Sequence, residues 1–204
     1  MKNESLNRWM YRVRFTSIRD LQEDLINEFV KKFKLVTSIY KDEIFRVFKW
    51  ENNLIVYGES NSYIQSHIKT SLEQFGDVRQ MLDIFHDDSL NLNWRKNAKP
   101  YEELVGSVIQ LKPEKFASYV FLHFQFQEEN RTKFNRTYII GSDGVFLFSY
   151  FELPAVISKT VEHSLGTSNS PKNWEEVMQE HFEPWSDKPN EKPWWRRSVL
   201  IYNN

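Results

Sequence analysis

The sequence predicts an α+β fold in which antiparallel strands form one or more sheets and helices pack on one face. Two observations support this class. Some segments alternate apolar and polar residues, as half-buried strands do, while others repeat apolar residues every three or four positions, as amphipathic helices do. Both halves of the 204 residues mix the two patterns, without the regular strand–helix alternation of a parallel sheet and without an evident internal repeat.

The first 85 residues begin with a strand and a helix. Tyr11, Val13 and Phe15 alternate with arginines, as in a half-buried strand, and apolar residues from Ile18 to Phe33 then recur at helical spacing. The elements expected here are a strand at 8–15, a helix at 17–33, two or three strands within 35–60, a helix at 64–76 and a short helix at 77–85. This order is compatible with a ferredoxin-like arrangement of the N-terminal half.

The polar segment 86–100 lacks a period and is the best candidate boundary. It would join a sub-domain at 1–85 to an α+β sub-domain at 101–204, although the chain could also be one continuous domain. The elements expected in the second half are a helix at 101–108, a strand at 118–127, a β-hairpin at 133–151, helices after Pro154 and Ser170, and a C-terminal aromatic strand at 194–202.

Composition limits the function classes. The net charge of −1 lacks the basic excess that drives binding to nucleic acids. No cysteine is present, so disulfides, thiolate metal sites and thiol nucleophiles are excluded. No apolar run reaches the roughly 18–20 residues of a membrane span, and no signal peptide is evident, so we expect a cytoplasmic protein without a membrane partner. The low content of Ala, Gly and Pro favours a low-GC bacterium or its phage as the source.

Familiar catalytic and cofactor motifs are missing. The five histidines do not form a zinc motif, and we predict neither a metal site nor a cofactor. Phosphate-binding loops and nucleophile elbows are absent as well. Whether the protein is an enzyme is left open, with the balance against it.

One histidine and several arginines are candidate binding residues. His123 falls in the middle of the strand expected at 118–127, where it could face a pocket or pair with a polar group across the sheet. Arg12, Arg14, Arg46 and Arg136 occur in alternating segments. If their strands share a sheet, its face could bind a carboxylate or phosphate, and the alternative is ordinary outward-facing charge.

The aromatic C-terminus gives the strongest remaining signal. The candidate residues here are Trp185, Trp194, Trp195, Arg196 and Arg197. Tryptophan and arginine are enriched at binding hot spots, but tryptophan also stabilises cores through its large apolar area. In a strand Trp194 and Trp195 would face opposite sides, so at least one should be structural and at most one should contact a partner.

These observations favour an intracellular, non-enzymatic regulatory protein that binds another protein. An immunity, antitoxin or anti-defence role would fit the size, the neutral charge and the missing catalytic motifs. The first alternative is a small-molecule-binding module whose aromatic pocket is lined by His123, Tyr150 and the C-terminal tryptophans. The second is an enzyme of unrecognised type, and the sequence leaves homo-oligomerisation open.

Overall fold

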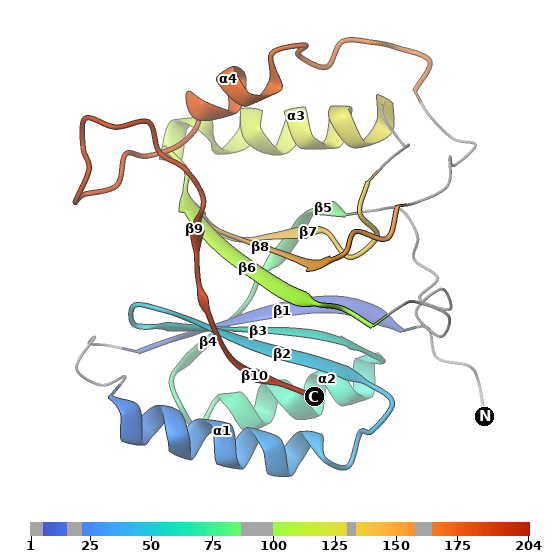
Figure 1. Cartoon of the computed structure of the whole chain (residues 1–204), viewed down its shortest axis with the longest axis vertical. Coiled ribbons are helices and arrows are strands. Elements are labelled where there is room, and N and C mark those ends of the chain that lie inside the picture. Colours follow the sequence, from blue (N-terminus) through green and yellow to red (C-terminus); the bar gives the residue numbers. More distant parts are fainter. Residues whose placement is uncertain (1–5, 16–21, 87–99, 130–133, 158–164) are drawn as a thin grey trace. The chain divides into compact units, whose positions relative to one another are not determined.

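The computed structural model describes residues 6–15, 22–86, 100–129, 134–157 and 165–204. Within these residues the chain has an α+β fold with two five-stranded antiparallel sheets and four helices, which confirms the predicted class (Figure 1). The described chain divides into two compact units. The first contains the residues up to Met81 together with Ser198–Asn204, and the second contains those from Leu82 to Arg197.

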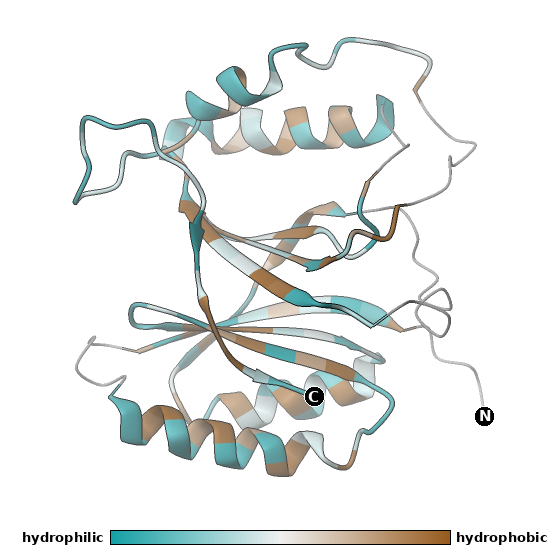
Figure 2. Ribbon diagram, viewed as in Figure 1, coloured by the Kyte–Doolittle hydropathy of each residue, from teal (hydrophilic) through white to brown (hydrophobic). Residues whose placement is uncertain are grey.

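The first unit is a five-stranded sheet with two helices on one face. Its strands are β1 (Asn7–Arg14), β2 (Ile44–Trp50), β3 (Asn53–Ser60), β4 (Asp77–Gln80) and β10 (Val199–Asn203), in the order β10-β2-β3-β1-β4. The helices are α1 (Glu23–Thr37) and α2 (Ser62–Leu72). Both helices are amphipathic, as the alternation of apolar and polar residues along them shows (Figure 2).

A hydrophobic core joins these helices to their sheet. Phe29 and Phe33 of α1 stack with ring centroids 5.5 Å apart, and both are buried against apolar side chains of β1, β2 and β3. Asn61 begins α2 by accepting a 2.9 Å hydrogen bond from the Ile64 amide, a typical N-cap. The two predicted helices are therefore confirmed in outline, whereas the first residues of the helix expected at 17–33 lie outside the described residues.

The second unit has the same layers. Its strands are β5 (Leu82–His86), β6 (Glu103–Gln110), β7 (Ile139–Asp143), β8 (Phe146–Leu153) and β9 (Arg196–Arg197), in the order β5-β7-β8-β6-β9. The helices α3 (Phe116–Glu129) and α4 (Trp174–Gln179) accompany this sheet (Figure 1). The predicted hairpin is confirmed, with its turn at Gly144, whose φ of 59° suits glycine.

The two units repeat one topology. The series β6-α3-β7-β8-α4-β9 follows the same order as β1-α1-β2-β3-α2-β4, and the strands occupy equivalent places in their sheets. The fifth strand of each sheet comes from outside that sheet's own series. In the first sheet it is β10, which follows β9 in the chain, and in the second sheet it is β5, which follows β4. This repeat has no evident counterpart in the sequence.

The strand expected at 118–127 is wrong, because this segment lies within α3. Its residues are apolar or aromatic on nearly every side, so a period of two could be read from them. A 3₁₀ turn at Pro113–Lys115 begins the helix, and proline is favoured at that position. Phe116, Tyr119, His123 and Phe126 follow at helical spacing, which is the signal that a period-two reading overlooks.

Two predicted helices are strands. The segment 101–108 contributes β6, where Val105, Val108 and Ile109 are almost fully buried. Because adjacent residues on this strand are both buried, the apolar–polar alternation that identifies a strand is lost. The segment 77–85 divides into β4 and β5, which belong to different sheets.

The remaining differences concern the C-terminal third. Pro154–Ile157 is not helical, and the rest of the helix expected there lies outside the described residues. The single strand expected at 194–202 is two strands, β9 and β10, separated by Ser198. The boundary expected at 86–100 falls almost entirely outside the described residues and stays a prediction. Within the described residues, no helix is long and apolar enough to cross a membrane.

Candidate functional site

The loop between α4 and β9 is pinned by its own aromatic and charged residues. The Trp185 indole Nε1 donates a 2.9 Å hydrogen bond to the Trp194 carbonyl oxygen. The Arg196 guanidinium lies 4.3 Å from the centroid of the Trp185 ring and forms a 2.7 Å ion pair with Asp187. A cation over an indole is attracted by the ring quadrupole, so these contacts hold both ends of the loop together.

The two neighbouring tryptophans have different environments. Trp195 packs against the apolar cluster of the second unit, with its ring centroid 6.2 Å from that of Phe182. Trp194 is 52% exposed although its carbonyl is fixed by Trp185. An exposed indole on an ordered backbone loses little conformational entropy when it contacts a ligand.

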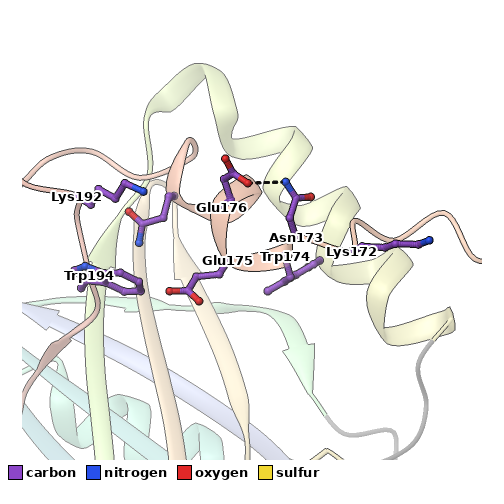
Figure 3. Close-up of a pocket in the computed structure, with 8 residues that line it drawn as sticks. Lys172, Asn173, Trp174, Glu175, Glu176, Lys192 and Trp194 are labelled. Atoms are coloured by element: carbon purple, nitrogen blue, oxygen red, sulfur yellow. Dashed lines mark hydrogen bonds between the residues drawn. The ribbon is translucent and has the colours of Figure 1, made fainter.

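Trp194 lines an open cavity of about 550 Å³. We name it the tryptophan pocket, and its lining residues are Lys172, Asn173, Trp174, Glu175, Glu176, Gln179, Lys192 and Trp194 (Figure 3). Within it, the Asn173 amide donates a 2.9 Å hydrogen bond to Glu176. Lys172 extends away from the other lining side chains, whereas Glu175 is drawn between the two indoles and Lys192 on the side of Trp194 (Figure 3).

Trp174 connects the tryptophan pocket to the buried aromatic layer under α4. Its ring centroid lies 4.4 Å from that of Phe126 and 5.0 Å from that of His123. A change in the position of Trp174 would therefore alter the surroundings of His123, although His123 does not line the tryptophan pocket.

His123 is a buried, neutral histidine. It is 5% exposed, its ring centroid is 4.0 Å from that of Tyr119, and its Nδ1 donates to the Tyr119 carbonyl oxygen at 2.9 Å. Burial lowers the pKa of His123 to about 4, outweighing the hydrogen bond to Tyr119, which alone would raise it. His123 lies on a helix and not on the strand expected from the sequence.

A carboxylate anchors the segment that leads into α4. Glu129, at the end of α3, accepts hydrogen bonds from the Thr167 hydroxyl at 2.7 Å, the Asn169 amide at 2.9 Å and the Ser170 amide at 2.6 Å. Desolvation would raise its pKa, but hydrogen bonds from Ser170, Thr167 and Asn169 lower the pKa of Glu129 to about 2. This carboxylate thus fixes the approach to the residues that line the tryptophan pocket.

The other predicted site residues do not join the tryptophan pocket. Tyr150 lies on β8, where its hydroxyl donates a 2.6 Å hydrogen bond to Glu152. Arg197 pairs with Glu103. In the sequence-based hypothesis Tyr150 and His123 shared one pocket with the C-terminal tryptophans, and of that set only Trp194 lines this one.

The four strand arginines divide between the units. Arg12 and Arg14 lie on β1 and Arg46 on β2, whereas Arg136 precedes β7 in the second unit. Arg12 donates a 2.8 Å hydrogen bond to Asn53. Arg46 is 2% exposed and its Nη1 donates to the Asn204 carbonyl oxygen at 2.8 Å. Arg12 and Arg46 thus have partners within the first unit, and an arginine face shared by all four is not found.

No group of three or more His, Asp or Glu side chains is placed to hold a metal ion in the described parts of the chain. The His86 Nδ1 lies 2.9 Å from the Asp83 Oδ2. The residues at 87 and 88 are outside the described parts of the chain.

Sequence reasoning identified Trp194 but missed the remaining lining residues. Trp174 falls within the helix expected after Ser170, where an aromatic residue needs no functional explanation, and Lys172, Gln179 and Lys192 carry no motif. Their grouping depends on how α4 and the 183–195 loop pack, which no local pattern encodes.

Comparison with known proteins gives no family. No family model matches the chain, and no curated protein is similar to it in sequence. Two solved structures resemble it over nearly its whole length. One is an anthrone oxidase-like protein, with a TM-score of 0.43, 12% identity, and coverage of 99% of this chain and 94% of that one. The other is a candidate monooxygenase from Fusobacterium nucleatum subsp. nucleatum, with a TM-score of 0.42, 11% identity, and coverage of 98% and 93%. Likeness at this level carries no functional argument.

Proposed function

We propose that the second unit binds a small molecule in the tryptophan pocket. The observation that carries this proposal is Trp194, which is 52% exposed, lines the cavity and is held in place through its own carbonyl. A cavity of about 550 Å³ lies within the roughly 300–1,000 Å³ of typical ligand sites.

The lining indicates the kind of ligand. Two indoles offer flat apolar surfaces, while Glu175, Gln179 and Lys192 offer an acceptor, an amide and a cation. A ring-shaped ligand with polar groups on its rim would match both sets of groups. A purely apolar ligand would leave the charged rim without partners, so we expect it to bind more weakly.

Indole signals in NMR spectra test this proposal directly. Titration of the ¹⁵N-labelled chain with small ring compounds should shift the Trp174 and Trp194 indole signals. Trp9 is the internal control, because it is buried in the first unit with its Nε1 bonded to Ser60 at 2.8 Å. Its signal should stay unchanged.

Two variants complete the test. Trp194→Ala should abolish the ligand-induced shift of Trp174, whereas Tyr63→Ala, which removes a 73% exposed aromatic ring from α2, should preserve it. Binding that survives Trp194→Ala, or that Tyr63→Ala weakens equally, would contradict the proposal.

A ferredoxin-like first half also stays a proposal. The element order β1-α1-β2-β3-α2-β4 and the strand order β2-β3-β1-β4 support it. An experimental structure of the first unit would test this proposal. Both helices should cross the same face of the sheet, with the strands in that order.

Binding to another protein is a second candidate function. Phe121 and Phe124 on α3 are 61% and 56% exposed, and exposed aromatic residues three positions apart share one side of a helix. Affinity capture with the native chain and with the variant Phe121→Ser/Phe124→Ser tests this role. A partner retained equally by both proteins would argue against this surface.

A further inference from the structure

The histidine that follows α4 is held in one tautomer by the backbone. His181 is 4% exposed, and its Nδ1 lies 2.8 Å from the Val177 carbonyl oxygen. Because a carbonyl only accepts hydrogen bonds, Nδ1 carries the proton in this contact. The neutral ring therefore keeps its lone pair on Nε2.

The Ser118 hydroxyl donates a hydrogen bond to this nitrogen. Its Oγ lies 2.6 Å from Nε2 of His181, and since this nitrogen has no proton in that tautomer, the serine hydroxyl is the donor. Ser118 is in the first turn of α3 and is exposed to solvent, whereas His181 is buried. A molecule in solution can thus reach the hydroxyl, while its hydrogen-bond partner is shielded.

Other helical serines bond backbone carbonyl oxygens. Ser66 on α2 bonds the Ser62 carbonyl oxygen at 3.0 Å, and Ser71 bonds that of Ile68 at 2.7 Å. A carbonyl oxygen does not take up a proton near neutral pH, but an imidazole nitrogen does. Ser118 Oγ has a contact of this kind as well, 3.2 Å from the Lys115 carbonyl oxygen, but its shorter contact, 2.6 Å, is to His181 Nε2, a group that can take up the hydroxyl proton. A hydroxyl bonded to a base that a third group orients is the arrangement of an activated nucleophile.

Lys112 contacts the backbone of the segment that carries His181. The Lys112 ammonium donates a 3.1 Å hydrogen bond to the Glu180 carbonyl oxygen, and the Lys112 amide donates to that of His181 at 2.9 Å. These two bonds fix the backbone that carries His181.

We propose that Ser118 is a nucleophile and His181 its general base, which gives the second unit an activity on esters independent of ligand binding in the tryptophan pocket. Ser118 Oγ bonds to the acyl carbon while its proton moves to His181 Nε2. The tetrahedral adduct then breaks the bond to the leaving alcohol, which receives that proton, and the acyl group stays on Ser118 as an ester. A water molecule attacks this ester, again giving its proton to Nε2, and releases the acid as the proton returns to Ser118.

A fluorophosphonate probe tests the nucleophile in the full chain. We expect one label per chain, located at Ser118 by peptide mass mapping, since the probe bonds to serines that a neighbouring base activates. Ser118→Ala should lose the label, and Ser66→Ala, the matched exposed helical serine, should keep it. An unlabelled Ser118 in the folded wild-type chain, or a label that persists in Ser118→Ala, would overturn the proposal.

The absence of cysteine allows a separate test of the base. Ser118→Cys and Ser66→Cys each introduce the single thiol of the chain. Contact with His181 should favour the thiolate, so iodoacetamide should alkylate Ser118→Cys about tenfold or more faster than Ser66→Cys at pH 6. Equal alkylation rates in two folded variants would refute the role of His181.

Discussion

The helices α1 and α3 occupy equivalent places in two units of the same topology but present different chemistry to their sheets. The buried pair on α1 is Phe29 and Phe33, and the buried pair on α3 is Tyr119 and His123. Both pairs are four residues apart with adjacent rings, at 5.5 Å and 4.0 Å between centroids. The first pair is pure hydrocarbon, whereas both rings of the second carry polar atoms.

The functions proposed above all fall in the second unit. A buried polar ring needs hydrogen-bond partners and stabilises a core less than a phenyl ring of similar size. The second unit nevertheless has two buried histidines, His123 and His181, and its tryptophan pocket shares Trp174 with the first of them. The first unit buries polar side chains as well, among them Arg46 and Glu59, so the contrast is confined to the paired rings of α1 and α3.

The largest expected effect comes from removing residues 199–204. In the first unit Tyr202 bonds Thr37 at 2.7 Å and packs on Phe33, and Asn204 bonds the Phe45 amide at 2.8 Å. We expect a loss beyond the roughly 3–5 kcal/mol of a core aromatic truncation. Amide hydrogen exchange should accelerate in β2 while β7 stays protected. Equal acceleration in both strands would show that the two units do not respond separately.

Next in size is a pair of substitutions at equivalent positions. Phe33→Ala should lower the free energy of unfolding by about 3–5 kcal/mol, because it leaves a cavity in a hydrocarbon core. His123→Phe, which gives α3 the residue type of α1, should change it by less than about 1.5 kcal/mol at pH 7. Denaturant titration measures both. If His123→Phe costs as much as Phe33→Ala, the histidine makes contacts that a phenyl ring cannot replace.

The pH dependence of stability should also distinguish the units. Unfolded His123 binds a proton below its usual pKa near 6.5, whereas in the folded chain burial keeps it neutral until about pH 4. The unfolded state therefore holds more protons in this window, and stability falls as the pH is lowered from about 6.5 to about 4, by roughly 3 kcal/mol in all. His123→Phe should remove this decline. A curve that keeps its shape in the variant would assign the decline to other groups.

The adjacent tryptophans should differ by a smaller amount. Trp195→Ala should lower the free energy of unfolding by about 2 kcal/mol, because its ring packs on the cluster of the second unit without being fully buried. Trp194→Ala should change it by less than about 0.5 kcal/mol, as at an exposed site. Thermal melts of the two variants test this difference, and equal losses would mean that Trp194 is also structural.

The smallest effect should be local. Glu129→Gln removes the charge that accepts three hydrogen bonds from 167–170. We expect faster amide exchange at Asn169 and Ser170 with little change in the melting temperature. Glu128→Gln is the neighbouring control, and similar exchange in both variants would argue against an anchoring role.

Sequence patterns predicted the elements that bury one face only. The helices α1 and α2 are of this kind, and each shows one clear helical period. The strands of the β7–β8 hairpin are buried on both faces, and this hairpin was predictable from the glycines that bound its turn. The helix α3 and the strand β6 were assigned wrongly because apolar residues surround the one and adjacent residues are both buried in the other. Periodicity fails in such segments because the pattern no longer distinguishes inside from outside.

The candidate site was predictable only in part for a related reason. Trp194 could be singled out because tryptophan and arginine are enriched at binding hot spots. The pair of Ser118 and His181, 63 residues apart, could not, since it depends on where α3 and α4 lie. The assignment of His123 to a strand also hid its spacing of four residues from Tyr119.

The position of β10 has a consequence for how the protein is made. The first sheet lacks its edge strand until residues 199–203 exist, about 120 residues after β4 is complete. At ribosomal speeds of about 5–20 residues per second, β2 would wait some 6–24 seconds with an open edge. A nascent chain in that state offers the edge to other strands, so its yield in a cell should depend on translation speed and chaperone supply.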